Sequence, residues 1–416
     1  MYVVAFLDRA NIAFAKPALQ TQLGISPKSY ALGASLFFVG YALFEIPSNL
    51  ILYRVGAKAW MARIMVSWGL VCAATIFARN SHTFYILRLL LGASEAGFFP
   101  GIILYLTYWF PRYTRGRILG SFYLGAPLAF IFGGPISSLL VHMPPYGMLR
   151  GWQWMFLVEG TLAIAVGIWS YSYLDSHPQD ALWLSCEERY AIVQAISREE
   201  QCRPANRRTE ILPLLRDRQV IRLSLIYLLI QISIYGVVFY LPTEVSALLQ
   251  ANRKGQVPAL ISSLVSAIPW ACAFAAALWL PAIADRTQRH RYLAAITLLV
   301  SGIASFLFPI LSAEPGLLAL SIAAAGFIAV QPLFWTLPSD YLSGRAAAAG
   351  FALINAIGNL GGFLAPNLKV FAESYFHSPL AGLWLLAVLT ITGAILIAAL
   401  KDVPTRPELD VNPDAQ

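Results

Sequence analysis

Two pairs of opposite charges lie inside otherwise apolar stretches of this 416-residue chain. Asp8 and Arg9 stand in the first stretch, and Arg88 and Glu95 stand in a later one. Arg88 and Glu95 are nearly two helical turns apart, so on a helix their side chains face the same way. A carboxylate can bind and release a proton, and a guanidinium can hold an anion. These four residues are therefore the first candidates for chemistry.

Each pair also has a structural explanation that the residues alone leave open. Asp8 and Arg9 can form a structural ion pair, and Arg88, nearer the outer end of its stretch, can extend its guanidinium to a membrane surface. Glu95 lies near the middle of its stretch and cannot do so. Charges near the centre of a bilayer are costly and usually face a functional cavity, which favours a functional role for all four residues.

Together, the two arginines and two carboxylates offer a physical route to coupled transport. Desolvation favours the protonated form of a buried carboxylate, and a nearby arginine favours the ionised form. An anion that binds the arginines withdraws part of their positive charge, so the carboxylate takes a proton more readily. Anion and proton then bind with positive coupling, and this coupling is reciprocal. The pattern predicts proton–anion symport.

Polar residues also recur every four positions in three later apolar stretches, which places them on one helical face in each. They are Tyr227, Gln231 and Tyr235, then Gln331 and Trp335, then Asn355 and Asn359. Substrate contact is one explanation, with Gln231, Tyr235, Asn355 and Trp335 as candidates, and Tyr41 is a comparable residue. The alternative is hydrogen bonding between membrane helices. Local ion pairs explain Glu45, Glu159 and Glu244 as well as a function does.

The composition indicates that membrane helices hold these residues. Apolar residues make up 58% of the chain and charged residues 12%, against about a quarter charged in a soluble domain. Apolar stretches of about 20 residues, enough to cross a bilayer, recur throughout, and lipid forces them to be helical. We expect an all-α integral membrane protein with spans at 1–20, 29–52, 60–78, 83–108, 117–141, 152–174, 219–244, 257–281, 291–311, 315–338, 345–371 and 379–401.

A long polar stretch divides these spans into six and six. The predicted parts are an N-terminal six-helix bundle (1–174), a cytoplasmic linker (175–218), a C-terminal six-helix bundle (219–401) and a disordered cytoplasmic tail (402–416). In the linker, Ser185 and Glu188 form a capping-box pattern that opens a surface helix. The same offset separates Gly133 from Gly361 and Gly134 from Gly362, which indicates duplicated halves. Apolar sequence starts at the first residue, so we expect that the first helix is truncated and that a short leader is missing.

The net charge of +8 does not indicate a nucleic-acid partner, because the basic residues gather in the loops predicted to face the cytoplasm. These are Arg54, Lys58, Arg63, Arg112, Arg115, Arg117, Arg286, Arg289, Arg291 and Arg345. This asymmetry orients a membrane protein and places both termini in the cytoplasm. The cysteines and histidines show no metal-binding spacing, and no nucleophile–base pair indicates an enzyme. We expect no cofactor, with the proton as coupling ion.

The charged motifs resemble a known family. Asp8-Arg9-x-Asn11, followed by Arg88-x6-Glu95-Ala-Gly-Phe-Phe-Pro, is similar to the anion:cation symporter branch of the major facilitator superfamily. Residues 230–236 and 326–338 look most like the bacterial rhamnonate and tartrate carriers. The resemblance implies two pseudo-symmetric six-helix bundles, Asp8 and Glu95 as proton-coupling acids, and Arg9 and Arg88 as carboxylate-binding groups. It further implies a monomer that carries a sugar acid or dicarboxylate such as rhamnonate, tartrate, galactonate or hexuronate across the inner membrane.

The family's gating loop is only partly matched. Arg54, Gly56 and Lys58 follow the second span, with tyrosine where aspartate is usual, and Asp285-Arg286 follow the eighth. An organic-anion exchanger or uniporter without proton coupling is the main alternative function. A drug exporter or neutral-sugar carrier would not need arginines within the membrane. A membrane sensor with a carrier fold would need a signalling part beyond residues 175–218.

Overall fold

The computed structural model describes residues 1–416 except 111–117, 119–120, 202–215, 252–257, 343 and 401–416. The longer helices are α1 (Tyr2–Leu23), α2 (Pro27–Val55), α3 (Ala57–Ala74), α4 (Ser81–Glu95), α5 (Phe98–Trp109), α7 (Gly125–Val141), α8 (Gly151–Tyr173), α9 (Cys186–Gln201), α11 (Arg218–Ala251), α12 (Ala259–Thr287), α13 (His290–Leu307), α14 (Ala313–Tyr341), α15 (Gly344–Tyr375) and α16 (Pro379–Ala398). Short 3-10 turns follow α3, α8 and α13 at Thr75–Phe77, Pro178–Asp180 and Phe308–Ile310. Among the described residues the only β pairing is one bridge between Tyr146 and Leu149.

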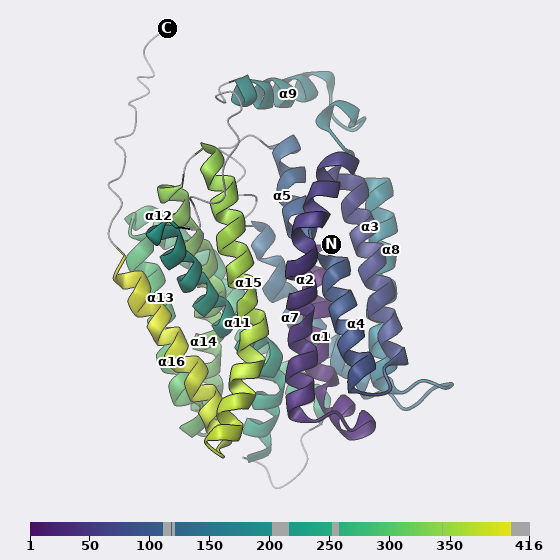
Figure 1. Ribbon diagram of the computed structural model, residues 1–416, viewed down its shortest axis with the longest axis vertical. Helices are drawn as coiled ribbons and strands as arrows, with labels where there is room; N and C mark the ends of the chain where they lie inside the picture. Colours follow the sequence, from purple (N-terminus) through teal and green to yellow (C-terminus); the bar gives the residue numbers. More distant parts are fainter. Residues whose placement is uncertain (111–117, 119–120, 202–215, 252–257, 343, 401–416) are drawn as a thin grey trace.

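The helices form two groups that stand side by side in Figure 1, α1 to α8 in one and α11 to α16 in the other. Each group holds six crossing segments when α4 and α5 are taken together, so the predicted all-α architecture of about twelve spans is confirmed. Eight helical segments in the described ranges are long and apolar enough to cross a membrane. The remaining four segments are α1, α2, α4 with α5, and α15, which include all four charged candidates and Asn355.

The fourth segment differs from its prediction. The apolar run predicts one helix over residues 83–108, but α4 ends at Glu95 and α5 begins at Phe98. Gly97 adopts a left-handed conformation with φ 86°, and the freed carbonyl of Ala96 accepts a hydrogen bond of 2.6 Å from the Ser48 hydroxyl. The sequence prediction missed this break because glycine is common inside membrane helices.

Small residues let the helices of each group approach closely. A side chain at Gly40 or Gly92 would meet the backbone of the facing helix, in the α2–α4 contact. One pair of repeated glycines occupies matching places, since Gly133 on α7 faces Leu7 of α1 and Gly361 on α15 faces Gln231 of α11. In each group the fifth segment therefore packs one repeated glycine on the first segment, as expected of duplicated halves. The second pair does not, because Gly134 faces Phe14 of α1 whereas Gly362 faces Phe38 of α2 in the other group.

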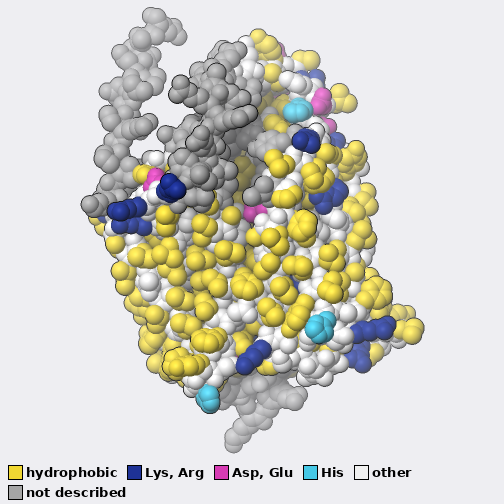
Figure 2. Space-filling model, viewed as in Figure 1, with side chains coloured by type: hydrophobic (Ala, Val, Ile, Leu, Met, Phe, Trp, Pro, Cys, Tyr) yellow, Lys and Arg dark blue, Asp and Glu magenta, His cyan; other side chains and the backbone are white. Residues whose placement is uncertain are grey.

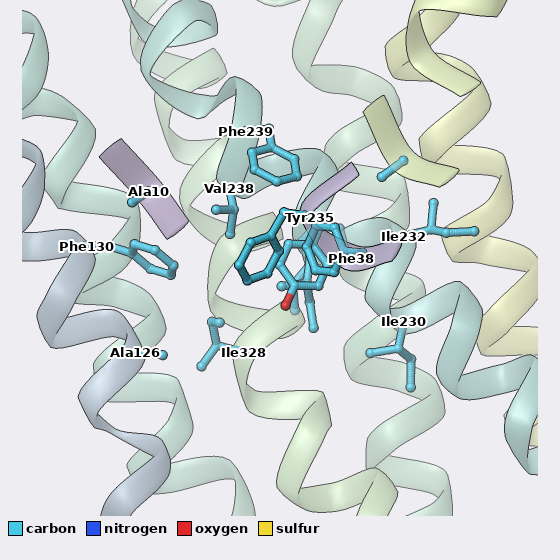
Figure 3. Close-up of a cluster of buried hydrophobic side chains, with 14 of the residues drawn as sticks. Ala10, Phe38, Ala126, Phe130, Ile230, Ile232, Tyr235, Val238, Phe239 and Ile328 are labelled. Atoms are coloured by element: carbon cyan, nitrogen blue, oxygen red, sulfur yellow. The ribbon is translucent and has the colours of Figure 1, made fainter. Parts of the chain in front are cut away.

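Aromatic and apolar side chains join the two groups. Phe38 on α2 packs against Tyr235 and Phe239 on α11, with ring centroids 4.5 and 6.2 Å apart, as Figure 3 shows. Nearby, Phe130 on α7 lies 4.2 Å from the Trp270 ring on α12. On the outside, hydrophobic side chains cover a broad band, with Lys, Arg and His toward its two ends (Figure 2). This distribution matches a bilayer-facing belt.

Polar contacts also join the groups at the end of the molecule opposite α9. The Asn367 amide on α15 donates a hydrogen bond of 2.9 Å to the Ser35 hydroxyl on α2. The Lys16 ammonium on α1 lies 4.7 Å from the ring of Tyr240 on α11. The Lys369 ammonium lies 4.3 Å from the same ring. Two cations from opposite groups therefore contact one aromatic side chain, and the groups are in contact at this end.

The surface helix predicted in the linker is present as α9. The backbone N–H of Glu188 donates to the Ser185 hydroxyl at 3.2 Å, and the Ser185 N–H donates to the Glu188 carboxylate at 3.0 Å. These reciprocal bonds form the predicted capping box. The expected disordered tail and the basic residues Arg112, Arg115, Arg117 and Arg345 lie outside the residues whose side chains the structure describes.

Candidate functional site

The closest pairing of candidate residues joins Arg9 on α1 to Glu95 at the end of α4. Arg9 donates from Nε and Nη2 to Glu95 Oε1, at 2.9 and 2.5 Å. The Glu95 side chain is 1% exposed and the Arg9 side chain 15%. Because the ion pair joins two helices far apart in sequence, the proposed Asp8–Arg9 structural pair is not what neutralises Arg9.

The Arg9 guanidinium also reaches the second group of helices. Its Nη1 lies 3.3 Å from the Tyr235 hydroxyl on α11, whose ring belongs to the aromatic contact in Figure 3. The rings of Phe6, Phe37 and Tyr41 lie 5.1, 5.4 and 5.5 Å from Arg9 Cζ. Arg9 is therefore held by a carboxylate, a phenol and aromatic faces, at the boundary between the two halves.

Arg88 does not extend to a membrane surface, so that alternative was wrong. Its side chain is 2% exposed, and its one described hydrogen bond is a long contact of 3.4 Å from Nη2 to the Ala34 carbonyl. Nε and Nη1 are buried without a hydrogen-bond partner among the described residues. The Phe37 ring lies 5.3 Å from Arg88 Cζ as well as beside Arg9, so both guanidinium groups flank one ring.

Asp8 points away from Arg9, into the interior of the first group of helices. Trp68 Nε1 on α3 donates to Asp8 Oδ2 at 2.5 Å, and the Cys72 thiol lies 3.3 Å from Oδ1. Asn11, one turn further along α1, lies 3.4 Å from the same oxygen. The structure therefore separates two acids that the sequence grouped together: Glu95 lies against Arg9, and Asp8 lies against Trp68 and Cys72.

Glu159 belongs to the Asp8 site, and its explanation by a local ion pair was wrong. Asn11 Nδ2 donates to Glu159 Oε2 at 2.9 Å, and the Ser137 hydroxyl donates to Oε1 at 2.6 Å. Both donors are neutral. Glu244 does have an ionic partner, since Lys369 Nζ lies 3.5 Å from its carboxylate. Sequence spacing contained no signal for Glu159, because its partners lie on different helices.

The polar candidates of the second half divide between the site and its surroundings. Gln231 is buried one turn before Tyr235 on α11, and its Oε1 has no described partner. Asn355 on α15 lies beside the Glu45 carboxyl of α2, across the two halves. Trp335 packs between Tyr227 and Phe351, with ring centroids at 4.9 and 5.8 Å.

The gating-loop candidates lie far from these groups, at the same end of the molecule as α9. Gly56 links α2 to α3 with φ 94°, and Arg54 is exposed. The Lys58 ammonium lies 5.4 Å from the Tyr171 ring, within the first group. Asp285 pairs with His290 at 2.9 Å, and Arg286 is exposed. These contacts stay within one half, so a gating role remains a prediction.

Comparisons with known proteins agree with this architecture. Residues 1–366 match the family model described as Major Facilitator Superfamily. The chain is 43% identical to the inner membrane transport protein RhmT of Escherichia coli, covering 99% of this chain and 94% of RhmT. It is 39% identical to an Agrobacterium vitis protein described provisionally as a tartrate transporter, covering 98% and 92%. It is 36% identical to a quinolone resistance transporter of Acinetobacter baumannii, covering 95% and 90%.

The match to the family model covers α1 to α14, most of α15 and all four charged candidates. The relatives are named as transporters and are matched over nearly their whole length. The chain is thus a multi-pass membrane protein, and it belongs to the major facilitator superfamily.

Proposed function

We propose that this protein is a secondary active transporter that carries a small organic anion together with protons across the cytoplasmic membrane. The observation that carries the proposal is Arg88, a buried guanidinium with two nitrogens that lack described partners. An uncompensated buried cation is unfavourable by several kcal/mol. A carboxylate bound beside Phe37 would supply the missing charge and the missing acceptors.

Arg9 supports the coupling part of the proposal. In the described state its charge is matched by Glu95. A substrate carboxylate that bound Arg9 would displace Glu95, which would then be a buried acid without a cation and would take up a proton. The anion and the proton would therefore enter the site together. An exchanger or uniporter would bind the same anion without this proton.

The polar groups around the arginines favour a hydroxylated acid. Gln231 Oε1 is an unpaired buried acceptor, and the Tyr235 hydroxyl is already within reach of Arg9. With Asn355 and Tyr41 nearby on α15 and α2, these groups fit the hydroxyls of a sugar acid or tartrate. The relative named for tartrate supports this class, and the description of RhmT supports an inner-membrane location. We also propose that both termini lie in the cytoplasm and that the protein functions as a monomer.

A quinolone exporter is the second candidate, because one relative carries that name. Quinolone drugs also bear a carboxylate, so Arg88 alone does not separate the two. A thermal-shift screen of the purified protein tests both, since a ligand of the folded state raises its melting temperature. We expect tartrate or rhamnonate to stabilise the protein, and the neutral polyols threitol and rhamnitol not to. Stabilisation by a neutral sugar, or by a quinolone and no sugar acid, would overturn the proposal.

A further inference from the structure

Two buried acids lie close together in the first group of helices, apart from the ion pair between Arg9 and Glu95. Asp8 on α1 and Glu159 on α8 are both 1% exposed. One nitrogen, Asn11 Nδ2, lies 3.4 Å from Asp8 Oδ1 and 2.9 Å from Glu159 Oε2. The two carboxyl groups therefore meet at a single amide.

The other described partners of these acids are neutral. Trp68 and Cys72 lie against Asp8, and Ser137 donates to Glu159. Among the ion pairs that the described side chains form, neither acid has a cationic partner. The site thus contains two acids and no compensating cation in contact.

The surrounding charges do not supply a balance. The charged and titratable groups facing the pair are Arg88 and Glu95 on α4 and the Cys72 thiol on α3. Arg88 is a single positive charge whose described hydrogen bond goes to the Ala34 carbonyl, and the charge of Glu95 is matched by Arg9. Two carboxylates that share a buried site do not both ionise, and they titrate as one unit.

The carbonyl oxygen of Asn11, Oδ1, is a buried acceptor beside the two acids, and the described contacts leave it unpaired. Buried acceptors are normally paired. An ionised carboxylate cannot donate to this oxygen, whereas the O–H of a protonated carboxyl can.

We propose that Asp8 and Glu159 share one proton across Asn11, which makes this cluster a proton-binding site separate from Glu95. The proton is taken from water and returned to water, and no other group is changed. The inference deepens the proposed function and rests on it for the coupling role. If α1 and α8 move relative to each other during transport, the distance between the two acids changes. The proton affinity of the pair then changes as well.

Infrared spectroscopy of the purified full-length protein tests for the shared proton without any substrate. A protonated carboxyl has a carbonyl stretch that an ionised carboxylate lacks. We expect this band at neutral pH, and we expect it to shift when the protein is made with ¹³C-aspartate or ¹³C-glutamate in place of the natural amino acid. A band that is absent at neutral pH, or that shifts with neither label, would overturn the proposal.

Isosteric variants then assign the band. The band should remain in both variants but respond to one label only, ¹³C-glutamate in Asp8→Asn and ¹³C-aspartate in Glu159→Gln. The remaining acid is buried without a cation in contact and keeps a proton. Glu95→Gln should retain the wild-type band. Loss of the band in Glu95→Gln alone would contradict a proton shared by Asp8 and Glu159. Loss of the band in wild type when Na⁺ replaces K⁺ at constant pH would also contradict it, because the site would then bind sodium.

Transport assays separate this inference from the proposed function. In proteoliposomes with tartrate, Glu159→Gln should carry fewer protons per tartrate than wild type while tartrate counterflow continues. Wild type that carries no organic acid would refute the proposed function and leave the infrared result standing. An unchanged proton-to-tartrate ratio in Glu159→Gln would refute the coupling role of the pair.

Discussion

Arg9 directs two hydrogen bonds to a single oxygen of Glu95, Oε1, at 2.9 and 2.5 Å. A fork-to-fork pair would instead use both carboxylate oxygens and would hold the guanidinium more firmly. The observed geometry leaves the Arg9 guanidinium open to a second carboxylate, which the proposed exchange of partners requires. The charge on Glu95 should therefore control whether Arg9 is available to the substrate.

Glu95→Gln should abolish the accumulation of tartrate driven by an inward proton gradient and leave tartrate counterflow. Glutamine occupies the same space but carries no titratable group, so Arg9 is free for the substrate whatever the pH. Uptake into proteoliposomes with and without a proton gradient measures both quantities. Glu314→Gln, at an exposed acid beginning α14, is the matched control. Undiminished accumulation in Glu95→Gln would exclude this carboxylate from coupling.

Substitutions at Arg88 test whether this arginine binds the substrate or only supports the fold. Arg88→Met removes a buried cation that lacks described partners at Nε and Nη1, so the ligand-free protein should melt at the same temperature or higher. Tartrate affinity should fall by about 10- to 100-fold, or roughly 1.4–3 kcal/mol, as for a lost charged hydrogen bond. Arg88→Lys should recover only part of the tartrate affinity, because an ammonium group cannot form the two parallel hydrogen bonds of a planar guanidinium.

Thermal unfolding measures the stability of the Arg88 variants, and calorimetric titration measures their affinity for tartrate. Arg79→Lys, outside the helices in the loop before α4, is the control and should change neither. A loss of several kcal/mol of stability in ligand-free Arg88→Met, with unaltered affinity, would show that Arg88 is part of the framework.

The sequence could predict what depends on composition and local spacing, but not what depends on contacts between distant helices. Apolar length located most spans to within a few residues, and Ser185 with Glu188 located α9. The Arg9–Glu95 pair joins α1 to α4, and Asn11 reaches Glu159 on α8. Such partners are separated by many residues, and no local periodicity records them. The break after Glu95 was missed although Gly97 and Pro100 stand three residues apart there, because a glycine or proline is also tolerated inside membrane helices.

The contacts opposite α9 predict a conformational effect. Asn367→Ala removes the hydrogen bond from α15 to Ser35 of α2, so the two groups of helices should separate at this end more often. Spin labels at Lys28→Cys and His377→Cys, near that end, would report longer distances in pulsed electron resonance. Thr21→Ala is the control, because its hydroxyl bonds only within α1, to Pro17. Identical distance distributions in all three proteins would rule out a role for Asn367 in closure.

The capping box of α9 makes a prediction about pH. Hydrogen bonds from the backbone and side chain of Ser185 lower the pKa of Glu188. A carboxyl with a lowered folded-state pKa stabilises the helix above its unfolded value, and this stabilisation is lost as pH falls through the folded value. Hydrogen exchange in the first turn of α9 should therefore quicken, relative to its intrinsic rate, only as the pH falls below the unfolded-state pKa of a glutamate, about 4.3.

Ser185→Ala should quicken the same exchange at neutral pH, as expected for a lost cap of about 1 kcal/mol. Ser312→Ala, before α14, is a comparison site where the N-cap serine makes no side-chain capping bond. Protection of α9 that is independent of pH in wild type would mean that the carboxylate does not cap the helix.

The break between α4 and α5 can be tested at Gly97. Two effects oppose Gly97→Ala: the left-handed backbone, with φ 86°, and the Ser48 hydroxyl that a new methyl group would meet. Gly147 has φ 60° and open space around it, so Gly147→Ala isolates the backbone effect, about 1 kcal/mol. Gly97→Ala should cost more than Gly147→Ala in thermal unfolding and should also weaken tartrate binding, because Glu95 stands directly before the break. Equal costs at the two glycines would mean that the contact with Ser48 does not determine this turn.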